Sequence, residues 1–345
     1  ACWHFPKPSA KPAHYSGAEI PPPDGYSPHL PSQWRGWAFR VNPCGDFEPW
    51  AAGLRSPNGL GMSKEGDLFI TDNQGEYFGA CVLMHVPRGA FLGHPEGLAW
   101  GTDASTEPFS IPLDVLDRKR LRPAVVFPYG VSGTSASQPL VDATGGRFGP
   151  FAGQWFVGDQ TYSTIMRVAL EKVGGGWQGA VFPFLSGFQC GVNRMVFAPD
   201  GSIWAGETQR GWGSAGARQE GLQHVIWNGS IPFEMQSMTL TKSGFRLTFT
   251  RPANAAALAN PANFAMHRFH YAYHRAYGSP MLGDTPVLVR EVKAAADGRS
   301  VELILADLVA GGEIHALQIS GLTAADGAPL RHASAWYTLN RRIDP

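Results

Sequence analysis

A short motif returns three times in the first two thirds of the chain and constrains the fold more than any other feature. Each copy follows an apolar strand and a turn, and each is followed by a polar loop and a further strand. The copies are DLFITDN (67–73), QWFVGDQ (154–160) and SIWAGET (202–208). Repeats of roughly 40 residues that each form a small sheet are typical of a β-propeller. Coincidental hairpins in an ordinary β-sandwich are the alternative interpretation.

The amino-acid composition also favours an all-β fold. The 345 residues include 42 Gly, 28 Pro, 20 Phe and 11 Trp, so turn formers and aromatic strand formers are both abundant. Hydrophobic residues make up 43% of the chain, enough for a sizeable core. The formal net charge is zero, which gives no indication of a nucleic-acid partner. No apolar run is long enough to span a bilayer.

The order of strand and turn signals predicts three regions. Residues 1–33 are rich in Pro and are expected to form an extended arm on a surface. Residues 34–230 hold a leading hairpin and three propeller blades, with a loop-rich insertion at about 97–139 that contains one short helix at 114–121. Residues 231–345 show short alternating strands with Asp-Gly turns, which predict an immunoglobulin-like β-sandwich.

The four cysteines give no sign of a metal site. No pair has the spacing of a zinc ribbon or of a haem attachment motif. Two disulfides and buried free thiols both remain open for Cys2, Cys44, Cys81 and Cys190.

Each copy of the repeated motif ends in carboxylates and amides. In a propeller these strand ends gather around the central channel, so the polar groups of successive blades are expected to converge. Their oxygens suit Ca²⁺ or sugar hydroxyls, although Asp and Asn also end strands by forming local turns. The clusters are Asp72-Asn73-Gln74, Asp159-Gln160 and Glu207-Thr208-Gln209.

Basic residues flank the same strands. Arg55 and Arg194 come just before the first strand of a unit, and Arg210 follows the third polar cluster. Convergent guanidinium groups suit a ligand with several carboxylates, whereas a salt bridge to a neighbouring blade is the alternative. His94, in the segment GHPEG, either lines the same mouth or is a buried structural histidine.

The segments RSPNGLGMSKEGDLFITDNQG (55–75) and VNRMVFAPDG (192–201) resemble the glucose/sorbosone dehydrogenases. They are more closely similar to large secreted propeller proteins of planctomycete-type bacteria that are grouped with them. The resemblance implies a six-bladed propeller that binds pyrroloquinoline quinone and Ca²⁺ above its channel and oxidises sugars. It implies that Arg55, Asn58 and Arg194 contact the quinone and that the Asp72 loop helps to hold Ca²⁺.

Three blades cannot close a ring. The chain therefore resembles the C-terminal part of such a protein or one piece of a nicked one. A companion polypeptide is expected to supply the other blades and the catalytic histidine. The family's cofactor-binding lysine has no obvious counterpart here. The resemblance implies a periplasmic or secreted sugar dehydrogenase. A non-catalytic propeller that binds carbohydrate or protein is the alternative, and a metal-dependent hydrolase or lyase on the same scaffold is the third.

The candidate site residues fall into three groups. The expected cofactor contacts are Arg55, Asn58, Arg194 and Arg210. The expected metal ligands are Asp72, Asn73 and Gln74. The expected substrate contacts are His94, Asp159, Gln160, Glu207 and Gln209.

Overall fold

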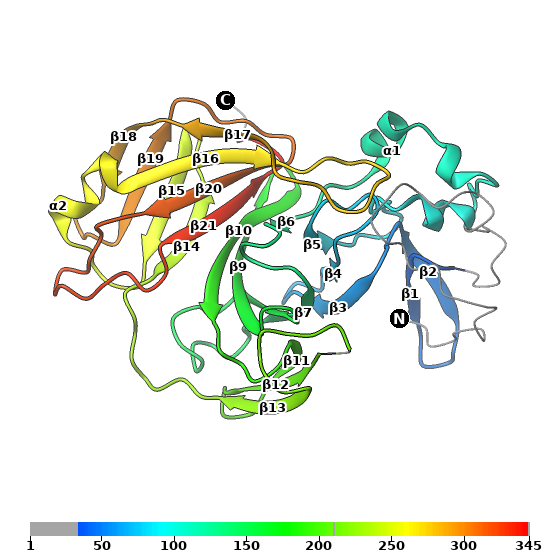
Figure 1. Cartoon of the computed structure of the whole chain (residues 1–345), viewed down its shortest axis with the longest axis horizontal. Coiled ribbons are helices and arrows are strands. Elements are labelled where there is room, and N and C mark those ends of the chain that lie inside the picture. Colours follow the sequence, from blue (N-terminus) through cyan, green and yellow to red (C-terminus); the bar gives the residue numbers. More distant parts are fainter. Residues whose placement is uncertain (1–33, 210, 344–345) are drawn as a thin grey trace.

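A computed structural model describes residues 34–209 and 211–343, and these residues are mostly β-structure (Figure 1). The α-helices of this part of the chain are the short α1 (Leu113–Lys119) and α2 (Ala255–Leu258). It also contains three 3-10 helices, η1 (Pro95–Ala99), η2 (Pro108–Ser110) and η3 (Pro261–Asn263). The prediction of a β-rich chain with one short helix in the insertion is confirmed. The predicted arm at 1–33 lies outside the described residues. No helix among them is long and apolar enough to cross a membrane.

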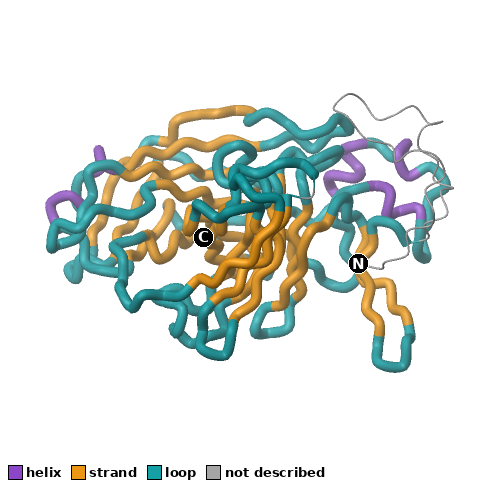
Figure 2. Tube along the Cα trace, turned by 60° about the horizontal axis from the view of Figure 1, so that its bottom comes forward, coloured by secondary structure: helices purple, strands orange, loops and turns teal. Residues whose placement is uncertain are grey.

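The N-terminal half begins with a hairpin and then forms a four-stranded antiparallel sheet, here called blade 1. The hairpin turns at 43–46 as the sequence predicts, and its base packs with blade 1 while its tip projects from the body (Figure 2). The hairpin strands are β1 (Trp37–Val41) and β2 (Phe47–Ala52). The strands of blade 1 are β3 (Pro57–Met62), β4 (Leu68–Asp72), β5 (Cys81–His85) and β6 (Val125–Phe127).

Two further sheets follow in chain order, here called blade 2 and blade 3. Blade 2 has β7 (Ala136–Val141), β8 (Trp155–Asp159), β9 (Thr164–Val173) and β10 (Gly176–Leu185). Blade 3 has β11 (Val192–Phe197), β12 (Ile203–Thr208) and β13 (Glu220–Val225). In each blade the repeated motif forms the second strand, so the three copies occupy equivalent positions.

The alternation of side chains along these strands explains how the blades pack. The second apolar residue of the motif points toward the following blade, since Phe69 packs on Trp155 of blade 2 with ring centroids 4.9 Å apart. Phe156 likewise shares a core with Val192 and Met195 of blade 3. Each buried Phe contributes roughly 2 kcal/mol to folding.

Glycine lets the first strands of neighbouring blades approach closely. A Cβ atom on Gly59 in β3 would lie 2.3 Å from Cα of Gln138 in β7. A Cβ atom on Gly61 would lie at the same distance from the Pro139 carbonyl oxygen. Larger residues at these positions would force blades 1 and 2 apart.

The C-terminal unit consists of two four-stranded antiparallel sheets with a common core that includes Phe245, Leu247, Leu303 and Leu317. The first sheet has the order β14 (Met235–Leu240), β15 (Gly244–Phe249), β19 (Ser300–Leu305) and β18 (Val289–Ala294). The second has the order β17 (Leu282–Val287), β16 (Phe264–His270), β20 (Glu313–Ile319) and β21 (Ser334–Leu339).

Strand β21 also pairs with β10, so blade 2 and the second sheet of the C-terminal unit form one continuous eight-stranded sheet. The hydroxyl of Tyr337 in β21 donates to the Glu171 carboxylate at 2.7 Å and accepts from the Gln178 amide at 2.9 Å. This sheet fixes the C-terminal unit against the blades, and no pattern in the sequence predicts it.

Candidate functional site

The carboxylate at the end of each repeated motif binds the loop that enters the first strand of the same blade. Asp72 is fully buried, and its two oxygens accept hydrogen bonds from the backbone N–H groups of Arg55 and Ser56, both at 2.7 Å. Burial raises the pKa of Asp72 to about 6, although these two hydrogen bonds lower it. In blade 1, therefore, the carboxylate acts as a clamp on its own backbone.

Asp159 and Glu207 repeat this arrangement. Asp159 accepts from the backbone N–H groups of Thr134 and Ser135, both at 2.8 Å. Glu207 accepts from the Cys190 N–H at 2.8 Å, and burial raises the pKa of this carboxyl group. The predicted equivalence of the three acids is thus present, and their oxygens face the chain's own loops.

The loop after Asp72 does not offer the free oxygen ligands that Ca²⁺ requires. The Asn73 side-chain oxygen accepts from the Cys81 thiol at 3.5 Å, and the Gln74 carbonyl accepts from Arg55 at 3.0 Å. With both Asp72 oxygens bound to N–H groups, the loop offers no free pair of carboxylate oxygens. The described residues contain no group of three or more His, Cys, Asp or Glu side chains that could hold a metal. As they lie, these residues do not fit Ca²⁺.

Arg55 is held within blade 1. Its guanidinium forms an ion pair with Glu76 at 2.8 Å and lies 5.1 Å from the centre of the Tyr277 ring. Gly75 makes room for it, because a Cβ atom there would lie 1.9 Å from the Arg55 Cζ. A quinone carboxylate would have to displace Glu76 to reach this guanidinium, so Arg55 does not fit the cofactor as it stands.

Three of the predicted residues do meet, one from each blade. The buried Asn58 of blade 1 donates to the Gln160 side-chain oxygen of blade 2 at 3.3 Å. Arg194 of blade 3 reaches the Asn58 side-chain oxygen at 3.5 Å. Gln160 in turn donates to the Thr208 carbonyl at 3.2 Å. The convergence of blade-end polar groups is therefore real for Asn58, Gln160 and Arg194.

The remaining predicted residues lie apart from this network. His94 is buried, with ring centroids 5.3 Å from Tyr77 and 5.9 Å from Phe109. Burial, and after it the charges of Arg55 and Arg35, lower the pKa of His94 to about 3, which makes it a neutral core histidine. Gln209 pairs through its backbone N–H with the Gln219 carbonyl at 2.9 Å. Arg210 lies outside the described residues.

The cysteines of the described part of the chain, Cys44, Cys81 and Cys190, are free thiols. Burial raises the pKa of Cys81 to about 12, so this thiol is inert at neutral pH.

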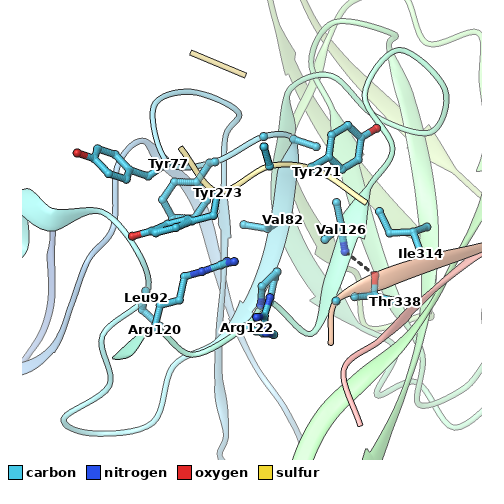
Figure 3. Close-up of a pocket in the computed structure, with 16 residues that line it drawn as sticks. Tyr77, Val82, Leu92, Arg120, Arg122, Val126, Tyr271, Tyr273, Ile314 and Thr338 are labelled. Atoms are coloured by element: carbon cyan, nitrogen blue, oxygen red, sulfur yellow. Dashed lines mark hydrogen bonds between the residues drawn. The ribbon is translucent and has the colours of Figure 1, made fainter. Parts of the chain in front are cut away.

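The sequence did not indicate the cleft between the blade 1 insertion and the C-terminal unit. It has a volume of about 420 Å³ and adjoins a smaller pocket of about 60 Å³, which Figure 3 shows. Segments more than 140 residues apart in the chain form its walls, so only the folded structure brings them together. The residues that line both spaces are Arg120, Arg122, Tyr271, Ala272, Tyr273 and Gly312.

Comparisons with known proteins give only partial matches. No protein-family model and no curated protein matches the chain. Among solved structures, an oxidoreductase described as a glucose dehydrogenase from Thermus thermophilus is 20% identical, with a TM-score of 0.37 over 52% of this chain and 47% of its own. The quinone-bound aldose sugar dehydrogenase of Streptomyces coelicolor is 16% identical, with a TM-score of 0.37 over 55% of this chain and 52% of its own.

The S-layer protein SbsC is 22% identical, with a TM-score of 0.26 over 33% of this chain and 14% of its own. The chain thus spans about half the length of the two dehydrogenases. At these TM-scores the matches identify no family.

Proposed function

We propose that the chain is a non-catalytic, protein-binding propeller module, completed by further blades from a companion polypeptide. The observation that carries this proposal is the exposure of one aromatic side chain. Phe69, Phe156 and Trp204 hold the same position in the repeated motif. Phe69 and Phe156 are fully buried beneath the next blade, whereas 37% of Trp204 is exposed.

The face around Trp204 has the composition of a blade interface. Strand pairing places Trp204 beside Val196 and His224, and the Trp204 and His224 rings stack at 4.2 Å. Val196 and Leu222 on the same face are largely exposed. Exposed large apolar side chains that lie side by side on a sheet are unusual on a protein that has no partner.

The opposite end of the blade series is open as well. Leu60 in β3 points away from blade 2 and is exposed. The residues in the equivalent strand positions of blades 2 and 3, Pro139 and Met195, are buried against the preceding blade. The β1–β2 hairpin therefore does not cover the first strand of blade 1. Within residues 34–209 and 211–343, neither end of the blade series has the neighbouring sheet that blade 2 has on each side.

The finer features of the fold belong to the same proposal. The strand order β14-β15-β19-β18 facing β17-β16-β20-β21 agrees with an immunoglobulin-like module, in which strands A, B, E and D form one sheet, if β17 is an added strand beside β16 in the other sheet. A ring of six blades and a periplasmic or secreted location remain predictions from the family resemblance.

Footprinting with hydroxyl radicals, read out by mass spectrometry, tests the proposal on protein isolated from its natural source. Trp204 is expected to react at least five-fold more slowly there than in the isolated chain. Trp212, which is 81% exposed, is the control and should react equally in both. Equal reactivity of Trp204 in both preparations, or natural material that consists of this chain alone, would refute the proposal.

A sugar dehydrogenase of the quinoprotein type is the second candidate. The interblade network of Asn58, Gln160 and Arg194 favours it, since it gathers amide and guanidinium groups where successive blades meet. Pyrroloquinoline quinone would supply the electron acceptor, but Arg55 and the Asp72 loop do not fit the cofactor or Ca²⁺ as they stand. Dye reduction by an aldose after addition of both, lost in Arg194→Ala, would support this candidate.

A further inference from the structure

The outer edge of blade 3 is unpaired in the described part of the chain. Blades 1 and 2 each have four strands and end with β6 and β10, whereas blade 3 ends with its third strand, β13 (Figure 1). β13 pairs with β12 along all six of its residues without a bulge. The chain then runs on to the C-terminal unit, and no later strand within residues 211–343 pairs with β13.

The hydrogen bonds around β13 show which of its backbone groups lie along this edge. The Gln209 N–H donates to the Gln219 carbonyl at 2.9 Å, so the odd-numbered residues of β13 bond to β12. The Thr208 N–H fits this register, because it donates to the Gly191 carbonyl on the other side of β12 at 2.8 Å. The outward N–H and C=O groups therefore belong to Glu220, Leu222 and His224. Within residues 34–209 and 211–343 these groups have no backbone partner.

Other edge strands of the described sheets are protected against pairing. The Val126 N–H of β6 donates to the Thr338 hydroxyl at 2.9 Å, and carbonyls of β14 accept from Arg167. β17 contains Pro286, and β18 contains Lys293 and a bulge. Proline, lysine, bulges and covering groups are the usual means of blocking an edge. β13 contains no proline, lysine or bulge, so its edge resembles one that another strand covers.

The side chains of this edge continue the exposed face around Trp204. Leu222 and His224 lie on that face, and Leu222 is 65% exposed. Ile226, the next residue in the alternation, is 66% exposed. Glu220 carries the formal charge of the strand and is also exposed. A strand that continued blade 3 would therefore meet one acidic and two large apolar side chains.

We propose that an extended segment of the companion polypeptide pairs with β13 and forms the fourth strand of blade 3. This inference rests on the proposed function, in which that polypeptide covers the neighbouring Trp204 face. Strand addition derives affinity from main-chain hydrogen bonds and specificity from alternate side chains. The added strand is expected to place an apolar side chain beside Leu222 and a basic side chain beside Glu220. Residues 1–33 suit this position less well, since they contain eight prolines and proline cannot donate to a ladder.

The test is hydrogen–deuterium exchange of single backbone amides, compared between protein isolated from its natural source and the isolated full chain. The amides of Leu222 and His224 are expected to exchange at least 100-fold more slowly in the natural assembly. Those of Gly221 and Gln223, which face β12, are the internal control and should be slow in both preparations. Equal exchange of Leu222 and His224 in both would overturn the proposal. If Trp204 is protected from hydroxyl radicals in the same assembly, the proposed function survives that result.

Two variants separate the backbone of this edge from its side chains. Leu222→Pro removes one outward N–H and keeps the bonds to β12, because proline is tolerated on an edge strand at such a position. Produced in the natural source, this variant should enter the assembly at least ten-fold less than the parent chain. Leu222→Ala has the smaller side chain but keeps the N–H, and it should lose no more than three-fold. Equal assembly of the two variants would overturn the strand addition.

Deletion of residues 1–33 tests the alternative occupant. The amides of Leu222 and His224 should exchange fast in the isolated full chain and remain fast after the deletion. Slow exchange in the isolated full chain that becomes fast after the deletion would show that residues 1–33 cover the edge. That outcome would overturn the proposal.

Discussion

Asp72 and Asp159 perform the same structural task one blade apart. Each is fully buried at the end of the second strand of its blade, and each accepts hydrogen bonds from two successive backbone N–H groups before the first strand. The distances are 2.7 Å in blade 1 and 2.8 Å in blade 2. The repeat thus reproduces a specific hydrogen-bonding device as well as a pattern of apolar residues.

Replacing Asp72 with Ala is expected to destabilise the chain strongly. The substitution leaves the N–H groups of Arg55 and Ser56 without their acceptor in a buried loop, at a cost of roughly 1–3 kcal/mol for each. The free energy of unfolding, measured in urea, should therefore fall by about 2–5 kcal/mol. Asp103→Ala, at an exposed position, serves as control. Equal stability of the two variants would contradict the clamp.

Gly75→Ala should disturb the Arg55 ion pair. The new methyl group would occupy the space of the guanidinium, so Arg55 must move away from Glu76. The buried Glu76 carboxylate then has lost its ion-pair partner. We expect a loss of about 2–4 kcal/mol in the free energy of unfolding. Gly206→Ala is the matched control, because a Cβ atom there meets its nearest neighbour at 3.7 Å. A Gly75 variant as stable as the Gly206 variant would show that Arg55 moves without cost.

The sequence predicted those features that depend on local pattern. The hairpin turns at 43–46 and 64–67 and the helix near 114–121 are signalled by neighbouring residues, and all are present. The equivalence of Asp72, Asp159 and Glu207 followed from the repeat. The direction of their oxygens did not, because a carboxylate that caps its own loop and one that faces a ligand have the same sequence.

Features that join distant segments could not be predicted. The pairing of β10 with β21 adds one edge strand to another, and neither strand carries a signal for its partner. The cleft beside Arg122 needs residues from an insertion and from two loops of the C-terminal unit. Arg167 was missed for the same reason, since nothing in the segment IMRVAL distinguishes a buried arginine from a surface one.

Arg167 should be essential for the junction between blade 2 and the C-terminal unit. It is fully buried between the rings of Phe151 and Phe182, at 4.1 and 4.3 Å, and it donates to the carbonyls of Met235 and Gln236. Burial lowers the pKa of its guanidinium to about 9.

Arg167→Met keeps much of the side-chain volume. It removes the guanidinium donor to the Met235 carbonyl and one of the two side-chain donors to the Gln236 carbonyl, which keeps the Gln154 amide. We expect a loss of about 3–5 kcal/mol in the free energy of unfolding. Cleavage by chymotrypsin after Trp227, close to the junction, should become faster. The exposed Arg246→Met is the control. Unchanged proteolysis at the junction would show that the eight-stranded sheet alone holds the two units together.

His94 should make stability depend on pH in the acidic range. Its pKa is about 3 in the folded chain, chiefly because of burial, against about 6.5 in an unfolded chain. Between these values the unfolded chain binds a proton that the folded chain does not. The contribution of His94 to the free energy of unfolding therefore decreases as the pH falls from about 6.5 toward 3, by up to about 1.4 kcal/mol per pH unit. Asp72, whose pKa burial raises to about 6, contributes in the opposite direction, so the comparison is made with a His94 variant.

His94→Phe removes the side chain that takes up this proton and keeps an aromatic ring beside Tyr77 and Phe109. Urea unfolding of both proteins from pH 7 to pH 4 should show a shallower slope for the variant, which becomes the more stable of the two at low pH. The Nδ1 atom of His94 lies 3.9 Å from the Glu96 carboxylate, so Glu96→Gln tests whether that charge supports protonation. Identical slopes for His94→Phe and the parent chain would mean that His94 takes up its proton without unfolding. The core around His94 would then have to open locally, without unfolding of the whole chain.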